Sequence, residues 1–300
     1  MVGMILVTGA SGAIGSRLVE RLCAEGERPI TAGRRPEVLL ERFPTLDAWE
    51  LDALRPETLP AALEGVSVLY YFIHSMEPGA ASFDERDLAA AMNVARSAKH
   101  AGVERIVYLG GLGQEDEDLS RHLSSRHETG RVLAEEGPPL VELRAAMVIA
   151  ASSASFRMLA DLVHRLPAMI VPRWVETRSQ PIAISDVVAY LAAARNIPLE
   201  EHRTVIEVGG ADVLTYREMI ESFAELEGRR RVLLGVPLLT PWLSSLWCGL
   251  TTSVSVSVAR PLIMGMTHET VVRGDEASRR FPEIRPLGFE GAVRRALEGE

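Results

Sequence analysis

Three glycines near the start of the chain have the spacing of a phosphate-binding turn. Gly9, Gly12 and Gly15 follow the apolar run Met4–Val7 and open a helical pattern that continues to Ala24. In such a strand–turn–helix unit, the first glycine permits a tight turn, the second lets the backbone approach a pyrophosphate, and the third lets the helix pack close to the sheet. The N–H groups at the helix start then bind the phosphates. The predicted dinucleotide contacts of this turn are Gly9, Ser11, Gly12, Ala13, Ile14 and Gly15.

The residues after the second expected strand, Pro29–Ala32, indicate which dinucleotide the turn prefers. An Asp or Glu at this place hydrogen-bonds the ribose 2′-hydroxyl of NAD. This chain has Arg34 and Arg35 instead, and guanidinium groups suit a 2′-phosphate through charge-assisted, bidentate bonds. We therefore expect NADP(H), with NAD(H) less favoured. Ordinary surface charges are the alternative interpretation of the two arginines.

Further candidates stand where other expected strands end, because parallel sheets bind ligands at the carboxyl ends of their strands. Asp52 is placed to accept a hydrogen bond from an adenine amino group, and a turn-forming aspartate is the alternative. His74 closes the fourth strand and is a candidate for contact with ribose or substrate, with a structural role as the alternative. The other predicted cofactor contacts are Ala53, Ile73, Leu109, Gly110 and Ala145.

The elements that must position these residues alternate between short apolar runs and helical patterns. Such alternation predicts an α/β fold, a doubly wound parallel Rossmann sheet with helices on both faces. The expected strands are Met4–Val7, Pro29–Ala32, Ala48–Leu51, Val66–Ile73, Arg105–Leu109 and Leu140–Leu143. The expected helices of this half are Ile14–Ala24, Phe83–His100 and Arg126–Glu136.

The second half is less regular and predicts a smaller, discontinuous C-terminal substrate lobe. We expect residues 1–150 to form the dinucleotide-binding domain, with 180–206 returning to it, and residues 151–179 and 207–300 to form the lobe. The elements expected here are strands at Gln180–Ile184 and Thr204–Val208, a helix capped at Ser185–Asp186 that runs through Ala194, and a helix Tyr216–Glu227 capped by Thr215.

One segment, Val232–Ala259, holds no charged residue. Its prolines, glycines and eight serines or threonines disfavour a membrane span. Trp242, Leu243, Leu246, Trp247 and Leu250 have helical spacing, whereas Val254, Val256 and Val258 alternate with serines as in a strand. We expect the segment to form core of the second lobe. An apolar wall or lid over a substrate pocket is the first alternative, and contact with a membrane surface is the weaker one.

Composition narrows the class of protein. The 300 residues are 47% hydrophobic and 24% charged with a net charge of −9, which argues against a nucleic-acid partner because phosphate contacts need a basic face. Cys23 and Cys248 stand far apart, and the histidines form no HExxH pair, so neither a disulfide framework nor a metal site is expected. We expect a cytoplasmic protein, since no charged stretch precedes an apolar one at the amino terminus.

Taken together, the chain resembles the short-chain dehydrogenase/reductase superfamily. The resemblance rests on the first turn and on the segments Tyr108–Gly113, Leu143–Ala146 and Pro181–Asp186. The chain is most similar to the extended and atypical branches, and in particular to the NAD(P)H-binding group that includes nitrogen-metabolite-repression regulator-like proteins, whose bacterial members resemble it at Leu119–Glu128. The resemblance implies a Rossmann fold and a nicotinamide cofactor over nearly the whole chain, and it leaves the substrate open.

The residues that usually perform the superfamily's chemistry are missing. Active members carry Tyr-x-x-x-Lys, in which the lysine lowers the tyrosine pKa for proton exchange. Lys99 is the single lysine here, and no tyrosine stands four residues before it. In the segment that takes the pair's place, Arg126 matches the lysine if His122 matches the tyrosine, and His127 matches it after a shift of one residue. We predict that Arg126 or His127 contacts the nicotinamide ribose and that His127 or His74 donates the proton; a structural His127 is the alternative.

Three functions are consistent with these features. The first is an NADPH-dependent oxidoreductase that reduces a small apolar carbonyl, enone or quinone-like molecule, supported by the complete turn and by an apolar second lobe that includes Trp242, Trp247, Met264 and Met266. The second is a non-catalytic NADP(H)-sensing protein, supported by the absent tyrosine–lysine pair. The third and weaker one is an assembly or quinone-associated protein at a membrane surface. No oligomeric state is predicted.

Overall fold

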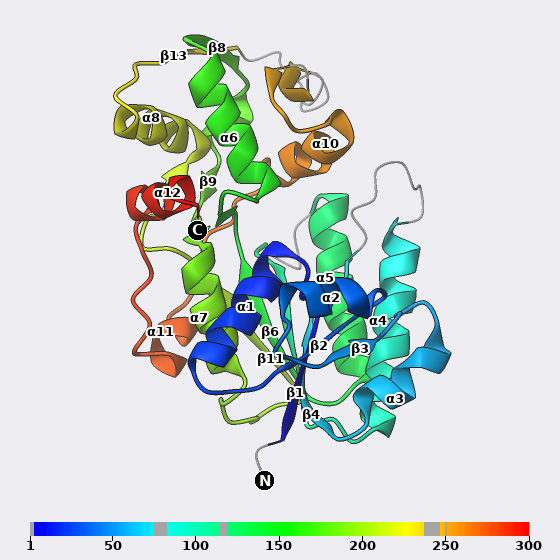
Figure 1. Ribbon diagram of the computed structural model, residues 1–300. Helices are drawn as coiled ribbons and strands as arrows, with labels where there is room; N and C mark the ends of the chain where they lie inside the picture. Colours follow the sequence, from blue (N-terminus) through cyan, green and yellow to red (C-terminus); the bar gives the residue numbers. More distant parts are fainter. Residues whose placement is uncertain (1–2, 75–82, 114–118, 237–246, 250, 300) are drawn as a thin grey trace.

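A seven-stranded parallel sheet forms the centre of the molecule (Figure 1). The computed structural model describes residues 3–74, 83–113, 119–236, 247–249 and 251–299. The strand order β11-β6-β5-β4-β1-β2-β3 places the topological switch between β1 and β4, where doubly wound sheets bind their ligands. The strands are β1 (Met4–Thr8), β2 (Ile30–Gly33), β3 (Ala48–Glu50), β4 (Val66–Tyr71), β5 (Arg105–Gly111), β6 (Leu140–Ala145) and β11 (Arg203–Val208).

Helices cover both faces of this sheet and enclose two apolar cores. Side chains alternate along each strand, so that Val107 and Leu109 enter one core while Ile106 and Tyr108 enter the other. The first core packs under α1 (Ala13–Ala24) and α7 (Ile184–Ala194), and the second under α3 (Leu59–Leu63), α4 (Phe83–His100) and α5 (Arg121–Glu136). Short elements at the edges are α2 (Pro36–Arg42), η1 (Pro56–Thr58) and α11 (Glu276–Arg280). The predicted doubly wound α/β fold is confirmed.

The elements outside the sheet gather around a third apolar core in a smaller lobe (Figure 1). Three two-stranded sheets, β10-β7, β12-β9 and β13-β8, join segments that are far apart in the sequence. The helices and turn of this part are α6 (Ala154–Arg165), η2 (Arg173–Glu176), α8 (Tyr216–Leu226), α10 (Val256–Gly265) and α12 (Phe289–Leu297). Its strands are β7 (Val148–Ile149), β8 (Ala168–Val171), β9 (Arg178–Ser179), β10 (Ile182–Ala183), β12 (Leu214–Thr215) and β13 (Val232–Gly235).

The starts of α4 and α8 agree with the sequence prediction, whereas α5 and α7 begin earlier than expected. Thr215 caps α8 in a capping box with Glu218, as its sequence predicts. α5 begins at Arg121, five residues before the expected Arg126, because Ser120 accepts a hydrogen bond from the Leu123 N–H at 3.4 Å and caps the earlier turn. α7 begins at Ile184, before the expected cap at Ser185–Asp186. The Asp186 carboxylate instead accepts from the Leu287 N–H at 2.7 Å, which ties the C-terminal segment to α7.

Two expected strands are shorter than predicted, and one is a helix. β4 stops at Tyr71 rather than Ile73, and the run Gln180–Ile184 contributes only β10. The alternating valines of Val254–Val258 do not form a strand, since residues from Val256 onward belong to α10. The reason is packing: Ala259, Ile263 and Met266 are all buried in the third core, and this spacing of four and then three residues fits one face of a helix, whereas a strand would turn Met266 to the opposite face.

Only part of the uncharged segment lies among the described residues. Of the expected helical run, Trp247 is described, while Trp242, Leu243, Leu246 and Leu250 lie outside the described residues. Among the helices that the structure describes, none has the length and apolar character needed to cross a bilayer.

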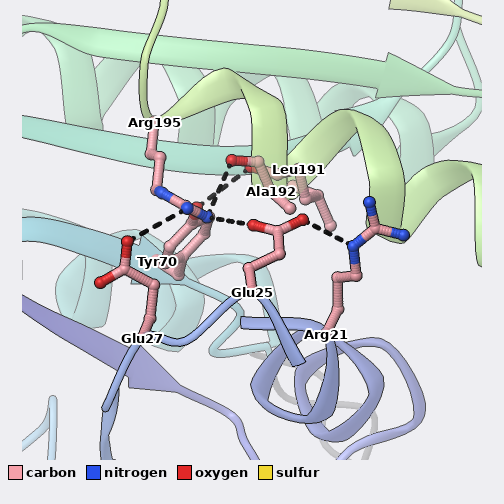
Figure 2. Close-up of polar contacts among 7 residues, drawn as sticks. All are labelled: Arg21, Glu25, Glu27, Tyr70, Leu191, Ala192 and Arg195. Carbon is pink, nitrogen blue, oxygen red and sulfur yellow. Dashed lines mark hydrogen bonds and ion pairs between the residues drawn. The ribbon is translucent and has the colours of Figure 1, made fainter. Parts of the chain in front are cut away.

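An ion-pair cluster joins α1 to α7 on the first face of the sheet (Figure 2). Arg195, which caps α7, donates to Glu25 at 3.0 Å and to Glu27 at 3.2 Å. Arg21 also donates to Glu25, at 2.6 Å. Burial by itself raises the pKa of Glu25, but the hydrogen bonds from Arg21 and Arg195 outweigh it and leave that pKa lowered. Because Glu25 follows the C-terminal end of α1, the cluster holds this helix from the end opposite the glycine turn.

Candidate functional site

Backbone geometry explains two of the three glycines between β1 and α1. Gly9 has a φ of +64°, in the left-handed region, and a Cβ there would lie 2.7 Å from the carbonyl oxygen of Phe72. A Cβ on Gly15 would lie 2.4 Å from the carbonyl oxygen of Gly9, so a side chain would push α1 away from the turn. Gly12 is exposed and donates its N–H to the Gly9 carbonyl at 2.9 Å. The turn therefore leaves its outer surface as bare backbone.

The start of α1 is suited to an anion. Its N-cap is Gly12, which has no side chain to accept from the first N–H groups, and its first turn holds no acidic residue. The first N–H groups of a helix have no partner within it, and its dipole adds partial positive charge at this end. Arg42, on α2, donates to the carbonyl oxygen of exposed Ser11 at 3.2 Å and so braces the turn from outside. These residues fit a pyrophosphate group.

Two exposed cations stand beside this turn. β2 ends at Gly33, and Arg34 and Arg35 follow it before Pro36 opens α2. Because Ala32 of β2 pairs with Thr8 of β1, the arginines come directly after the strand that borders the turn. Within the part of the chain that the structure describes, neither guanidinium has a hydrogen-bond or ion-pair partner. Both positive charges are therefore available to an anion.

The third strand contributes a turn. One carboxylate oxygen of Asp52 accepts from the Leu54 N–H at 3.1 Å, and the Asp52 N–H donates to the Thr58 hydroxyl at 3.0 Å. This is the turn-forming arrangement that the sequence left open for Asp52, although within the described ranges its second carboxylate oxygen accepts no such bond. Ala53 is buried, and its carbonyl oxygen accepts from the Asn93 amide at 2.9 Å.

A threonine joins the two strands at the topological switch. The Thr8 hydroxyl donates to the Tyr70 carbonyl oxygen at 2.9 Å and accepts from the Phe72 N–H at 3.0 Å. This bridge holds the end of β4 against the end of β1. Half-buried Ile73 and exposed His74 follow directly, so both come after the strand end rather than within the strand as predicted.

The residues that replace the catalytic pair hold α5 against the end of β5. Arg126 donates to the Leu109 carbonyl oxygen, and its guanidinium lies 5.1 Å from the centre of the Tyr108 ring. His127 is buried, and its Nε2 lies 2.9 Å from the Gly111 carbonyl oxygen. A carbonyl oxygen only accepts, so Nε2 must carry the hydrogen. Both side chains therefore hold α5 in place, which agrees with the alternative interpretation that His127 has a structural role. The side chain of His122 lies outside the described residues.

A buried carboxylate explains the glycine at the end of β5. Glu142 is fully buried and accepts from Arg144 Nε at 2.8 Å and from Arg203 Nη2 at 2.8 Å. A Cβ on Gly130 of α5 would lie 2.6 Å from one of its oxygens, and a Cβ on Gly110 would lie 3.0 Å from the other. The absence of side chains at both glycines therefore makes room for Glu142. The sequence offered no signal for this ion-pair group, because Arg203 comes from β11 and meets Glu142 and Arg144 of β6 only in the folded sheet.

An apolar cavity of about 310 Å³ lies in the second lobe. One wall is a single face of α6, where Ser155, Met158, Leu159 and Leu162 follow one another at helical spacing. Met147, two residues beyond the end of β6, brings the cavity toward the carboxyl edge of the sheet. The other lining residues are Met169, Ile170, Val171, Pro172, Trp174, Val175, Tyr216, Ile220, Trp247, Cys248 and Met266. Trp247 and Met266 thus line a pocket, whereas Met264 is exposed.

Few polar groups reach this cavity. Burial raises the pKa of Tyr216 to about 12, against the hydrogen bonds of its hydroxyl with Ser179 and Thr270. Burial also raises the pKa of the Cys248 thiol, to about 11. The Trp174 indole N–H is buried and has no hydrogen-bond partner in the part of the chain that the structure describes. The Ser155 hydroxyl has none among the described residues either. The cavity thus suits a mostly apolar molecule with an acceptor atom.

Comparison with known proteins agrees with this geometry. Residues 9–156 match the family described as NAD(P)H-binding. The chain is also 30% identical over 230 residues, 75% of this chain and 74% of the relative, to a (4-alkanoyl-5-oxo-2,5-dihydrofuran-3-yl)methyl phosphate reductase of Streptomyces griseus subsp. griseus. The chain belongs to the NAD(P)H-binding family. The predicted membership of an NAD(P)H-binding group is confirmed.

Solved structures show the same fold along nearly the whole chain. An NADPH-dependent quinone oxidoreductase of Escherichia coli superposes with a TM-score of 0.77 at 19% identity, covering 98% of this chain and 100% of that chain. A Citrobacter sp. triphenylmethane reductase complexed with NADP(H) gives 0.75 at 18% identity, with 98% and 99% covered. The Rossmann architecture of this NAD(P)H-binding protein is therefore shared beyond the dinucleotide turn and includes the second lobe.

Sequence reasoning missed three features of this NAD(P)H-binding protein. No sequence motif connects Arg42 with Ser11, because the two residues come into contact only after α2 has packed beside the turn. Glu142 is an acidic residue in a strand that otherwise reads as a buried apolar run. Ser155 and the α6 face were detectable only as an amphipathic pattern, which does not tell a core helix from a pocket wall.

Proposed function

We propose that this protein is an NADP(H)-dependent oxidoreductase that reduces a small apolar carbonyl, enone or quinone-like substrate. The observation that carries the proposal is the apolar cavity, whose Met147 lies two residues beyond Ala145, the predicted cofactor contact at the end of β6. Three similar proteins support the proposal, because their names describe reductases of a furanone phosphate, a quinone and a triphenylmethane dye. All three names describe reductions of unsaturated molecules.

NADP(H) is the cofactor we propose in preference to NAD(H). The support is the pair of exposed, unneutralised arginines after β2, in a position where an acidic residue would serve NAD. Arg42 adds a third cation at the same edge of the turn. The names of both solved structures include NADPH or NADP(H), which is consistent with this preference.

NADPH, when bound, supplies a hydride to the substrate. The chain must then hold the substrate, keep water away and provide a hydrogen bond to the reacting oxygen. The apolar walls on α6 and β8 exclude water, which strengthens electrostatic interactions within the pocket. We assign the hydrogen bond to the Ser155 hydroxyl, because it has no protein partner among the described residues and stands on the same wall of the cavity as Met158. Arg126 and His127 hold α5 against the end of β5.

The test is NADPH consumption with aldehydes, ketones, enones and quinones of increasing apolar size. We expect turnover with the apolar members and slower turnover in Ser155→Ala. Met158→Trp should place an indole in the cavity and raise KM for large substrates, with the NADPH Kd unchanged. Arg157→Trp on the exposed face of the same helix is the matched control, and its KM should not change. An equal rise in KM for both tryptophan variants would show that the cavity is not the substrate site.

A second candidate is a non-catalytic NADP(H) sensor. The observation that favours it is the use of Arg126 and His127 as braces to backbone carbonyls, in the segment where active relatives of the superfamily carry their catalytic pair. Tight NADPH binding without turnover across the whole panel would select the sensor. In either role we place the protein in the cytoplasm, because two cysteines far apart in the sequence suit a reducing compartment.

A further inference from the structure

The outer face of the β8–β13 sheet is apolar and exposed. Along β8, Met169 and Val171 point into the core while Ala168 and Ile170 face outward. In the paired strand β13, Val232 and Leu234 are exposed as well. Ile170, Val232 and Leu234 expose 55%, 55% and 56% of their surface, the three highest values among large apolar side chains in the described ranges. A strand face in contact with water normally carries polar residues, so this face, which we name the apolar ribbon, fits a partner.

Arginines stand at both ends of the apolar ribbon. The strands are parallel, with Val232 beside Ala168, so Arg230 and Arg231 adjoin one end. Arg173 follows the other end directly after Pro172. Within the described residues Arg173 and Arg230 form no ion pair. These cations are notable in a chain with a net charge of −9.

Three carboxylates in the segments that precede or follow β8 and β13 are already partnered. Asp161 lies 3.2 Å from Arg165 and accepts from the Ser253 N–H, and Glu176 accepts from Arg217 at 2.7 Å. Glu227 lies 3.1 Å from His164 and 3.8 Å from Arg229. These three carboxylates therefore do not neutralise Arg173 and Arg230.

We infer that the apolar ribbon docks on the surface of an anionic lipid bilayer. Apolar side chains in the centre insert at the acyl boundary, and arginines at the rim reach the headgroup phosphates with their long stems. Charge favours this occupant over a second copy of the chain. Two ribbons packed face to face bring arginines of like charge together at the rim, which opposes association.

The apolar ribbon lies directly outside the apolar cavity. The inward-facing residues of β8, Met169 and Val171, line the cavity, and Ile170 contributes both to the cavity lining and to the outer surface. Figure 1 shows β8 and β13 at the tip of the second lobe, far from the central sheet. A bilayer at this tip would deliver an apolar molecule directly to the cavity. This last step rests on the proposed function, whereas docking itself does not.

Flotation with lipid vesicles tests the inference without any activity measurement. The full chain should float with vesicles of phosphatidylglycerol and phosphatidylcholine, and not with phosphatidylcholine alone. Leu234→Glu should lower the vesicle-bound fraction about tenfold, since it puts a charge where a leucine enters the acyl boundary. Leu297→Glu, at another leucine exposed to 44%, is the matched control and should float as the parent does.

A charge reversal separates lipid binding from other outcomes. Arg173→Glu combined with Arg230→Glu should abolish flotation with the anionic vesicles, whereas Arg279→Glu on α11 should not. Unchanged thermal unfolding and unchanged NADPH affinity would show that each variant is folded. Absence of flotation, equal flotation with neutral vesicles, or a dimer that Leu234→Glu dissociates would each overturn the inference. Failure of the reductase assay would leave the flotation result standing, so the two proposals fail separately.

Discussion

Replacing Arg34 with alanine should weaken NADPH binding and leave NADH binding unchanged. A hydrogen bond to a charged group contributes about 1.5–3 kcal/mol. Both Arg34 and Arg35 are exposed, so water and salt screen the interaction and the lower value applies. At about 1.4 kcal/mol per factor of ten, each single variant should raise the NADPH Kd about tenfold. The double variant should raise it by less than the product if both guanidinium groups bind the same phosphate.

Calorimetric titration of both cofactors at low and at physiological salt measures this effect. The preference for NADPH should shrink as salt rises, because screening weakens the 2′-phosphate contact that NADH lacks, whereas it affects the pyrophosphate of both cofactors alike. Arg157→Ala removes another exposed arginine on α6 and should change neither Kd. Equal affinity of the parent protein for NADPH and NADH would refute the reasoning, as would an Arg34→Ala variant that loses both cofactors to the same extent.

Two further predictions concern stability. Burial raises the pKa of the Cys248 thiol from 9.0 to about 11. Between these two pH values the thiol is ionised in the unfolded chain but not in the folded one, so the free energy of unfolding should fall as the pH rises. Denaturant titrations of Cys248→Ala should show a shallower alkaline decline, by up to about 1.4 kcal/mol per pH unit. Arg195→Met should lower the free energy of unfolding by about 1–3 kcal/mol near neutral pH, because Glu25 and Glu27 lose a largely buried partner. The lowered pKa of Glu25 means that this difference should shrink in acid and disappear once the pH has fallen through the folded-state pKa of that carboxyl. Arg21→Met, which removes an exposed partner of the same Glu25, should cost less than about 0.5 kcal/mol, and a larger cost would contradict the account.

The dinucleotide half of the fold was predictable because its signals are local. Gly9 needs a positive φ, and Gly15 needs the absence of a Cβ, whatever the rest of the chain does. The strands of the sheet are short apolar runs separated by helices of ordinary length, which is a pattern that only a parallel sheet satisfies. Details at the ends of elements were less predictable. The cap at Ser120 places the start of α5 five residues earlier than expected, and Asp186 binds the Leu287 N–H rather than capping its own helix.

The second lobe depended on tertiary contacts. The alternating valines after Val254 satisfy a strand and a helix equally well over so short a run, and the burial of Ala259, Ile263 and Met266 on one face is what the helix achieves. The sequence by itself established the turn, the cation pair at Arg34 and Arg35 and the absence of the tyrosine–lysine pair. Only the folded chain could form the cavity and the apolar ribbon, because both are made by segments that have no common spacing. A local pattern records which face of an element is apolar, and the packing partner decides whether that face becomes core, pocket or surface.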